Sequence, residues 1–139
     1  MRWIEIKTLA DIEYIQKEYN NFEDSILVNF RFESGNYVDT QRVEYDNNDN
    51  NLYFLFQRLD ENPFSIEIMF EQTKRFNFFA PIRGNDIWRA EIEFAKIVKN
   101  DEFYYWTKWE DFNPYNEEHL NYNDFILIES KQVKWRVVE

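Results

Sequence analysis

The sequence predicts a mainly β (α+β) protein, in which an antiparallel sheet curls into a sandwich or a partly open barrel and one helix lies near the N-terminus. Apolar and polar side chains alternate over most of the chain after residue 24, which is typical of half-buried strands. Clusters of Asn, Asp, Gly and Pro separate these runs at short intervals, as in an antiparallel meander. One segment alone has helical spacing, and the absence of β-α-β spacing argues against a parallel sheet.

The helix is predicted over residues 9–19. Thr8 and Asp11 have the spacing of a capping box, in which a threonine oxygen accepts an amide hydrogen bond and the acid favours the positive end of the helix. Apolar residues then recur at spacings of three and four and form one face: Leu9, Ile12, Ile15 and Tyr19. The pair Asn20-Asn21 is predicted to end the helix.

The strands are predicted from runs with a period of two. The clearest run, residues 25–33, has one apolar face that consists of Ile26, Val28, Phe30 and Phe32. The other predicted strands are residues 52–57, 64–71, 74–79, 90–95, 103–109, 125–129 and 132–138. Where these runs carry acids, as at Glu67 and Glu71, the acids keep to one side and predict a solvated face of the sheet. The segment 113–123 is predicted to be the longest loop.

The length and composition predict a single domain over residues 1–139, because two cores would leave each half of the chain too small. The chain has no cysteine, which excludes disulfide scaffolds, thiolate metal sites and thiol nucleophiles. The first residues carry charges every few positions, and no apolar run reaches the ~20 residues of a membrane span. We therefore expect a cytoplasmic protein without a membrane partner.

The net charge is -11, from 27 acidic and 16 basic residues. Nucleic acids and anionic membranes are bound through positive potential, so neither is expected as a ligand. A basic protein is the natural complement of such a surface. Repulsion between like charges also favours a monomer, or at most a weak homodimer.

Few residues are suited to catalysis or to metal binding. His119 is the single histidine, so we expect neither a metal site that needs several nitrogen or sulfur ligands nor a cofactor. Glycine occurs only at Gly35 and Gly84, which excludes glycine-rich phosphate-binding loops. Glu91 and Glu93 share one side of a predicted strand at ~7 Å, within the range of a glycosidase carboxylate pair. An alternative function is therefore a small β-barrel that binds a small molecule or carbohydrate, or hydrolyses it with such a pair.

Acidic and aromatic residues cluster between residues 101 and 118. This combination suits the binding of a basic protein, since charge steers the encounter and buried rings hold the complex. The predicted partner-binding residues are Asp101, Glu102, Tyr104, Trp106, Trp109, Glu110, Asp111, Glu117 and Glu118. The strand 103–109 has rings on both faces. It is either a central strand covered on both sides, which we favour, or a strand that presents Tyr and Trp to a partner.

Two segments resemble a known group of proteins. They are Phe22-Glu23-Asp24-Ser25, and Ser65-Ile66-Glu67-Ile68-Met69-Phe70 running into Arg75-Phe76-Asn77. These segments are similar to the F-H-D-[SA] and S-[VI]-E-[LI]-x-F segments of a group of small bacterial proteins, some of which are immunity proteins of polymorphic toxin systems. The resemblance implies a cytoplasmic, β-rich protein that neutralises a toxin by direct binding without catalysis. A toxin nuclease, whose basic nucleic-acid site the protein covers, is one such partner. Glu23 stands where that family usually has histidine.

Overall fold

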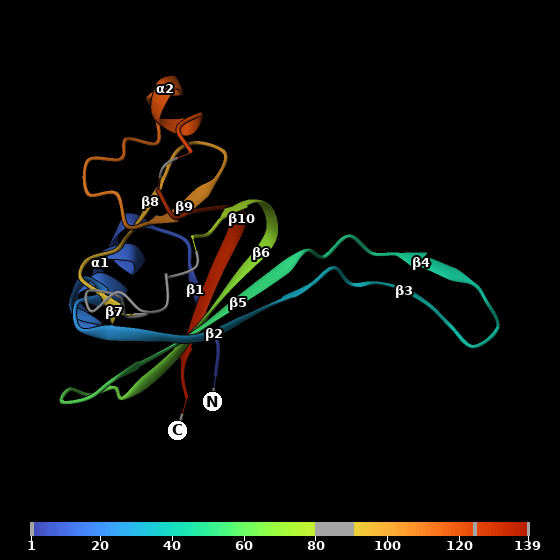
Figure 1. Ribbon diagram of the computed structural model, residues 1–139, viewed down its shortest axis with the longest axis horizontal. Coiled ribbons are helices and arrows are strands. Elements are labelled where there is room, and N and C mark those ends of the chain that lie inside the picture. The colour runs from blue at the N-terminus through green and yellow to red at the C-terminus, as the bar shows by residue number, and fades with distance from the viewer. Residues whose placement is uncertain (1, 80–90, 124, 139) are drawn as a thin grey trace.

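The computed structural model describes residues 2–79, 91–123 and 125–138 (Figure 1). The helices are α1 (Leu9–Glu18), the 3-10 helix η1 (Asn20–Phe22) and α2 (Glu117–Leu120). The strands are β1 (Ile4–Ile6), β2 (Ser25–Glu33), β3 (Asn36–Val38), β4 (Glu44–Asp46), β5 (Asn51–Arg58), β6 (Ser65–Asn77), β7 (Glu91–Ile92), β8 (Lys96–Lys99), β9 (Tyr104–Thr107) and β10 (Leu127–Val137). Within these described ranges, no helix has both the length and the apolar character that are needed to cross a bilayer.

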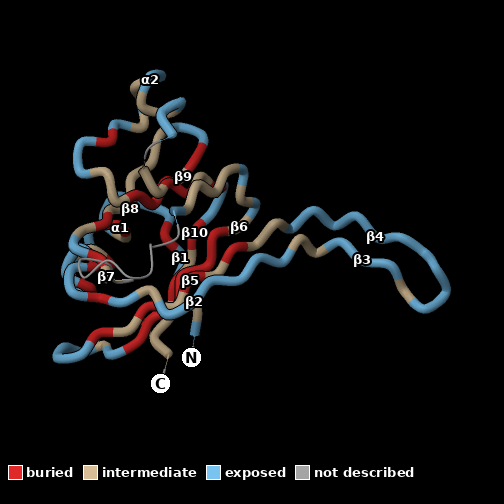
Figure 2. The backbone as a smooth tube through the Cα atoms, viewed as in Figure 1, coloured by how far each residue is buried: buried red, intermediate tan, exposed pale blue. Residues whose placement is uncertain are grey.

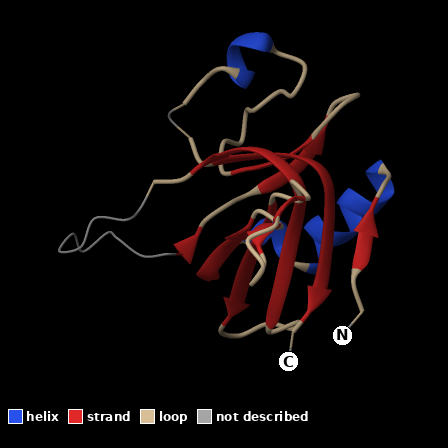
Figure 3. Cartoon of the chain, turned by 90° about the vertical axis from the view of Figure 1, so that its right-hand side faces the viewer, coloured by secondary structure: helices blue, strands red, loops and turns tan. Residues whose placement is uncertain are grey.

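Eight of the strands form one sheet in the order β7-β2-β5-β6-β10-β9-β8, with β1 paired to β10. All of these pairings are antiparallel. The sheet curls strongly into a half-barrel with α1 beside it (Figure 3). β10 is the central element, because β6 pairs along one of its edges while β9 and β1 share the other. The predicted class, a curled antiparallel sheet with one main helix, is confirmed.

Irregularities bend the two longest strands. Each of β6 and β10 joins two runs that the sequence predicts as separate strands. Between the runs, Gln72 has a φ of 50°, and the register of β10 against β6 shifts between Glu129 and Ser130. An extra residue reverses the faces of a strand beyond it. The alternation of apolar and polar residues is therefore interrupted at positions where the strand itself continues.

β2 has the predicted bounds but not the predicted face. Its register shifts between Leu27 and Asn29, so that Leu27 lies opposite Phe56 and Phe30 lies opposite Phe54. The prediction of one continuous apolar face is wrong, because this bulge moves the core side from odd-numbered to even-numbered residues. Ile26 and Val28 are exposed, whereas Phe30, beyond the bulge, packs against Phe54 and Phe76 with ring centroids 5.8 and 5.2 Å apart although 41% of it is exposed. Phe32 is exposed where β2 ends.

The predicted strand 90–95 is reduced to the two residues of β7. Ile92 and Ala95 are both buried although they are three positions apart, so the alternation ends at β7. Ala90 lies outside the described residues.

α1 begins at the predicted capping box. The Thr8 hydroxyl accepts a hydrogen bond from the Asp11 amide at 3.2 Å, and the Asp11 carboxylate accepts from the amides of Lys7 and Thr8 at 2.8 and 3.0 Å. Ile12 and Ile15 are buried on the apolar face of the helix. The predicted helix is therefore confirmed, and it ends at the predicted asparagine pair.

α1 and η1 also bridge the opening of the half-barrel. The amide of Ala95, between β7 and β8, donates to the carbonyl of Asn21 at 2.9 Å. The Gln16 side chain donates to the Ala95 carbonyl at 3.2 Å and accepts from the Ile97 amide at 2.9 Å. Helical residues therefore occupy backbone groups at the edge of β8 that would otherwise be free to pair with another strand.

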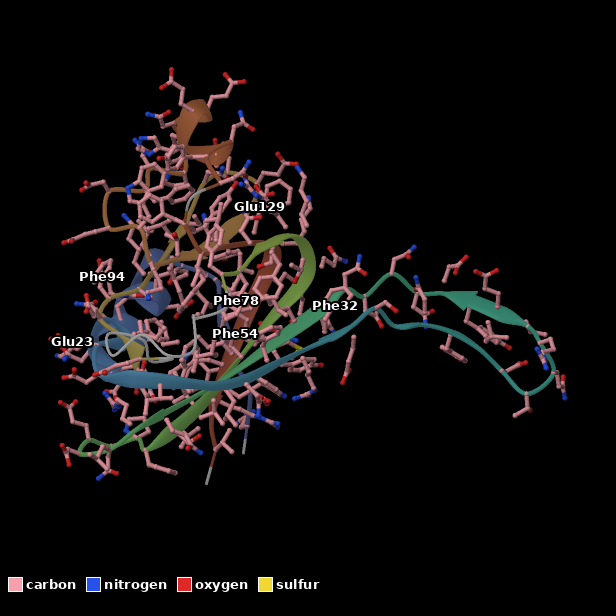
Figure 4. The ribbon with its side chains drawn as sticks, viewed as in Figure 1. Glu23, Phe32, Phe54, Phe78, Phe94 and Glu129 are labelled. Atoms are coloured by element: carbon pink, nitrogen blue, oxygen red, sulfur yellow. The ribbon has the colours of Figure 1, made fainter. Side chains whose placement is uncertain are left out.

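The main core fills the inside of the curl, where buried residues from the sheet and α1 meet (Figure 2). Trp106 lies at its centre and is 1% exposed. Its ring centroid is 5.6 to 5.8 Å from those of Phe22, Phe54 and Phe56. Phe54 is seen inside the curl in Figure 4. Phenylalanines thus supply much of the core.

β3 and β4 stand apart from this sheet as a two-stranded ribbon. They lie in a long excursion between β2 and β5, residues 34–50, which we call the arm. The arm projects away from the half-barrel and is exposed along most of its length (Figures 1 and 2). The sequence predicts turn-forming segments here but no strand.

Candidate functional site

The predicted partner-binding residues fall within residues 96–123, which we call the acidic lobe. It comprises β8, β9, the long loop and α2, and it projects from one end of the half-barrel (Figure 1). A small apolar core lies beneath the loop and consists of Phe103, Tyr105, Phe112 and Leu127, with Val98, Trp109 and Leu120 packed against it. Trp106 faces the main core on the other side of β9. β9 is therefore covered on both faces, which confirms the favoured alternative for this strand.

Asn100 fixes the turn between β8 and β9. Its Oδ1 accepts hydrogen bonds from the amides of Glu102 and Phe103 at 2.9 and 2.8 Å. Its Nδ2 donates to the Pro114 carbonyl at 2.9 Å and to the Tyr105 hydroxyl at 3.2 Å. One side chain therefore ties this acidic turn to the long loop.

Lys96 anchors the beginning of that loop. Its Nζ donates to the carbonyls of Glu110 and Phe112 at 2.5 and 2.9 Å. Burial lowers the pKa of Lys96, while the carboxylates of Asp111 and Glu110 oppose this shift. The backbone from Glu110 to Phe112 is thus held in place, and the side chains of Glu110 and Asp111 remain exposed.

The short helix α2 is held at both its start and its histidine. Asn116 caps it by accepting hydrogen bonds from two amides of the first turn, at 2.9 and 3.3 Å. Nδ1 of His119 accepts from the Asn113 amide at 3.0 Å, and its ring lies 4.3 Å from that of Trp109. The single histidine therefore organises the loop.

Trp109 packs inside the lobe. Its ring stacks on Phe125 at 4.8 Å with an interplanar angle of 6°, and it lies 5.4 Å from the ring of Tyr122. These contacts leave Trp109 partly buried, whereas Tyr122 is exposed beside it. Trp109 is thus a partly buried packing residue, and not a free surface ring.

The other two predicted aromatic residues differ from each other. Tyr104 is partly buried, and its hydroxyl donates to the Lys7 carbonyl at 3.3 Å. Trp106 is buried against Phe22 and Phe56 in the main core. Its expected role as a surface contact is therefore wrong, because the alternation along β9 directs its ring inwards.

Six predicted carboxylates are exposed, and they are Asp101, Glu102, Glu110, Asp111, Glu117 and Glu118. Among the described residues, Glu102 alone of these six forms an ion pair, with Lys131 at 3.9 Å. Lys74 and Lys131 each lie 4.8 Å from the ring centroid of Phe103. The lobe is therefore an acidic surface with cations along its border at β6 and β10.

Tyr115 extends this surface, although it is not among the residues predicted to bind a partner. It is 68% exposed, and its hydroxyl donates to the Asp101 carboxylate at 3.5 Å. Tyr115 and Tyr122 both lie in the predicted loop 113–123. Tyrosines that lie among acids in a predicted loop are the sequence signal that would have identified these two residues. The alternation that is used for strands does not apply in a loop.

The two carboxylates of the predicted pair, Glu91 and Glu93, do not line the same pocket. Glu91 lines an open hollow of about 450 Å³ together with Asp24, Asp60 and Glu61, around the side chain of Arg58. Glu93 is exposed and is not among the residues that line this hollow. The expected placement of Glu91 and Glu93 on one regular strand is wrong, because β7 ends at Ile92.

The described residues include no group of three or more His, Asp or Glu side chains that is placed to hold a metal ion.

The lobe offers exposed carboxylates, accessible rings and a backbone fixed by hydrogen bonds, which are the components of a polar binding surface. Comparisons of the chain with models of protein families, with curated proteins and with solved structures found no match.

Proposed function

We propose that this protein is a cytoplasmic, non-enzymatic binding protein of the immunity type, which neutralises a basic toxin by direct contact through the acidic lobe. The observation that carries the proposal is the set of six exposed carboxylates on turns that Asn100, Lys96 and Asn116 hold in place. A fixed backbone lowers the entropic cost of binding, because the turns that carry the carboxylates need little further ordering.

The charge of the lobe suits a cationic partner. Exposed carboxylates raise the rate of encounter with a basic protein through long-range attraction, and salt screens this attraction. A nuclease presents such a basic surface, because it must attract phosphates. Binding of the lobe to that surface would exclude the nucleic acid by competition for the same cations.

The rings of the lobe would supply the short-range contacts. Tyr115 is exposed with its hydroxyl on the Asp101 carboxylate, Tyr122 is exposed in the same loop, and Trp109 is partly exposed. Tyrosine and tryptophan are enriched among the residues that dominate binding energy. The acidic side chains would thus set the association rate, and the rings would slow dissociation.

Charge reversal tests the proposal. The probe is the purified product of the gene that adjoins the gene of this protein, and the measurement is its association rate by stopped flow at low and high salt. The variant is Asp101→Lys, Glu102→Lys, Glu110→Lys and Asp111→Lys in one chain, and we expect association to slow by about tenfold or more at low salt. Its rate should also lose most of its dependence on salt.

A matched control changes the net charge equally outside the lobe. Glu13, Glu18, Glu23 and Asp60 are exposed and are replaced together by Lys. This control should associate nearly as fast as the unmodified protein. Equal slowing by both variants, no binding by the unmodified protein, or turnover of a chromogenic glycoside by the purified protein would each overturn the proposal.

A further inference from the structure

The arm is a ribbon with two different faces. Tyr37 lies opposite Tyr45, and Val38 lies opposite Glu44. Residues directly opposite each other share a face, and their neighbours along the strand take the other face. Tyr37 and Tyr45 therefore form an aromatic face, and their rings stack at 4.8 Å with an interplanar angle of 14°. Glu44 lies on the reverse face with Asp46, so that face is acidic.

The root of the arm is held by hydrogen bonds. The side chain of Asn36 accepts from the Asn48 amide at 2.7 Å and donates to the Asn48 side chain at 3.0 Å. The amides of Gln72 and Thr73, in β6, donate to the carbonyls of Asp49 and Asn50 at 3.0 and 2.9 Å. The ribbon therefore leaves the body in a direction that the bend of β6 sets.

The tip of the arm is also ordered by its own side chains. Oδ1 of Asp39 accepts from the amides of Gln41 and Val43 at 2.8 and 3.0 Å. Hydrogen bonds from the Val43 amide and then the Gln41 amide lower the pKa of Asp39. The tip is therefore a defined turn in which the Asp39 carboxylate fixes the backbone, and Arg42 is part of the same turn.

Apolar side chains of the arm are nevertheless open to solvent. Tyr37 is 54% and Val38 is 60% exposed, and Val43 and Tyr45 are exposed as well. Phe32 adds a further exposed ring where β2 leaves the half-barrel for the arm (Figure 4). An isolated two-stranded ribbon gains little stability in water. Contiguous exposed apolar residues on such an element are typical of an interaction surface.

The acidic charge of the arm favours a cationic protein as the occupant of this surface. The arm has four acidic residues, Asp39, Glu44, Asp46 and Asp49, and one basic residue, Arg42. A second copy of the chain carries a net charge of -11 and would be repelled by it. A cationic protein is attracted to it, and a groove on such a protein can accept the tyrosine face.

We propose that this protein also binds its basic partner through the arm. The tyrosine face packs in a groove of the partner, and the carboxylates of the reverse face pair with Lys or Arg at the rim of that groove. This inference rests on the proposed function and adds a second contact to it. Tyr37 and Tyr45 are the residues that should slow dissociation most, because they present the largest apolar area of the arm.

The test uses two arm variants of the full chain, Tyr37→Ser with Tyr45→Ser, and Glu44→Lys with Asp46→Lys. The probe is again the purified product of the adjoining gene, and the measurement is the dissociation constant by calorimetry. Each variant should weaken binding by at least about tenfold. The matched controls, Tyr14→Ser and Glu13→Lys with Glu18→Lys, change exposed residues of α1 and should bind as the unmodified protein does.

The outcomes separate the arm from the lobe. If the arm variants bind normally while reversal of the lobe charges slows association, the arm inference is overturned and the proposed function stands. If the tyrosine variant changes only self-association in sedimentation, the occupant is a second copy and the inference is wrong. If the unmodified protein does not bind the probe, both are overturned. Unchanged melting temperatures of the arm variants show that the half-barrel remains folded.

Discussion

Arg136 donates both Nε and Nη2 to one oxygen of Glu67, at 3.1 and 2.8 Å. Arg31 donates to the other oxygen of Glu67 at 3.1 Å. The Glu67 side chain is only 9% exposed although it lies on the outer side of the half-barrel. Each guanidinium also lies over a ring, Arg136 at 4.3 Å from Trp3 and Arg31 at 3.8 Å from Tyr53. Charged and aromatic side chains thus cover this face of the sheet.

Glu67→Ala should destabilise the fold. The change removes three charge-assisted hydrogen bonds and leaves two guanidinium groups without their shared acceptor. Removal of one partner from a buried ion pair costs roughly 3 to 5 kcal/mol, and partial exposure of the two arginines places the expected loss near the lower end of that range. Chemical denaturation, with the free energy of unfolding taken from the midpoint and slope, measures this loss.

Glu33→Ala is the matched control for that prediction. Glu33 also pairs with Arg31, at 3.1 Å, but both side chains are more than half exposed. An exposed pair contributes about 1 kcal/mol or less. A loss of stability as large for Glu33→Ala as for Glu67→Ala would contradict the assignment of Glu67 as the centre of the network.

The burial of Glu67 depends on residues that are distant in the sequence. The alternation through β6 correctly identifies a strand, and it predicts a solvated face for Glu67 and Glu71. In the structure, the residues from Ser65 to Phe70 are buried on both faces. The cover over Glu67 comes from Arg31 and Arg136, which are 36 and 69 positions away in the chain. Periodicity within one strand contains no information on such distant cover.

Trp106→Ala should lower the free energy of unfolding by roughly 3 to 5 kcal/mol, the usual cost of removing a large buried ring. Trp106 contacts three core phenylalanines, and its indole N–H has no hydrogen-bond partner among the described residues. Trp106→Phe should therefore cost clearly less, because it keeps a ring and removes that buried donor. Denaturation midpoints of the two variants give the comparison. Equal losses would argue against packing as the main contribution of Trp106.

The bulges and the arm were beyond what the sequence could predict. The strand bounds of β2 are predicted correctly, but the face reverses within the strand at Leu27 to Asn29. Such a shift depends on pairing with β5, which local alternation does not encode. The arm was missed for a related reason. Its strands have three residues each, too few for a period of two to be recognised between turn-forming residues.

The predicted partner-binding residues differ in exposure, since the six acids are exposed and Trp106 is buried. The clustering of acids between residues 101 and 118 locates the lobe, and these acids are exposed as a surface requires. The ring of Trp106 is internal because its face of β9 lies against the main core. The rings of Phe103 and Tyr105 on the opposite face are covered by the loop of the lobe, which Asn100 and His119 hold through contacts with no local sequence pattern.

Gly35→Ala should disturb the arm and leave the half-barrel folded. Gly35 has a φ of 79°, and a Cβ there would lie 2.2 Å from Oδ2 of Asp49. The unfavourable backbone conformation alone costs on the order of 1 kcal/mol. We expect the amide resonances of Tyr37 and Tyr45 to shift, with little change in melting temperature, because the ribbon makes few contacts with the body.

A second substitution separates the two causes of that strain. Asp49→Gly removes the side chain that meets the new Cβ, so Gly35→Ala with Asp49→Gly should recover part of the native arm spectrum. The part that is not recovered measures the cost of the positive φ. A large fall in the melting temperature of Gly35→Ala alone would show that the arm supports the body more than its contacts indicate.

The capping box of α1 should make stability depend on pH through Asp11. Hydrogen bonds from the amides of Lys7 and then Thr8 lower the pKa of Asp11 in the folded protein. The folded state therefore binds this proton more weakly than the unfolded chain. The stabilisation is present above the unfolded pKa and is lost as the pH falls through the folded pKa.

Asp11→Asn should be less stable than the unmodified protein at neutral pH, and the two stabilities should converge in strong acid. Glu13→Gln, on the same helix but outside the capping box, should show no such convergence in denaturation curves recorded across that pH range.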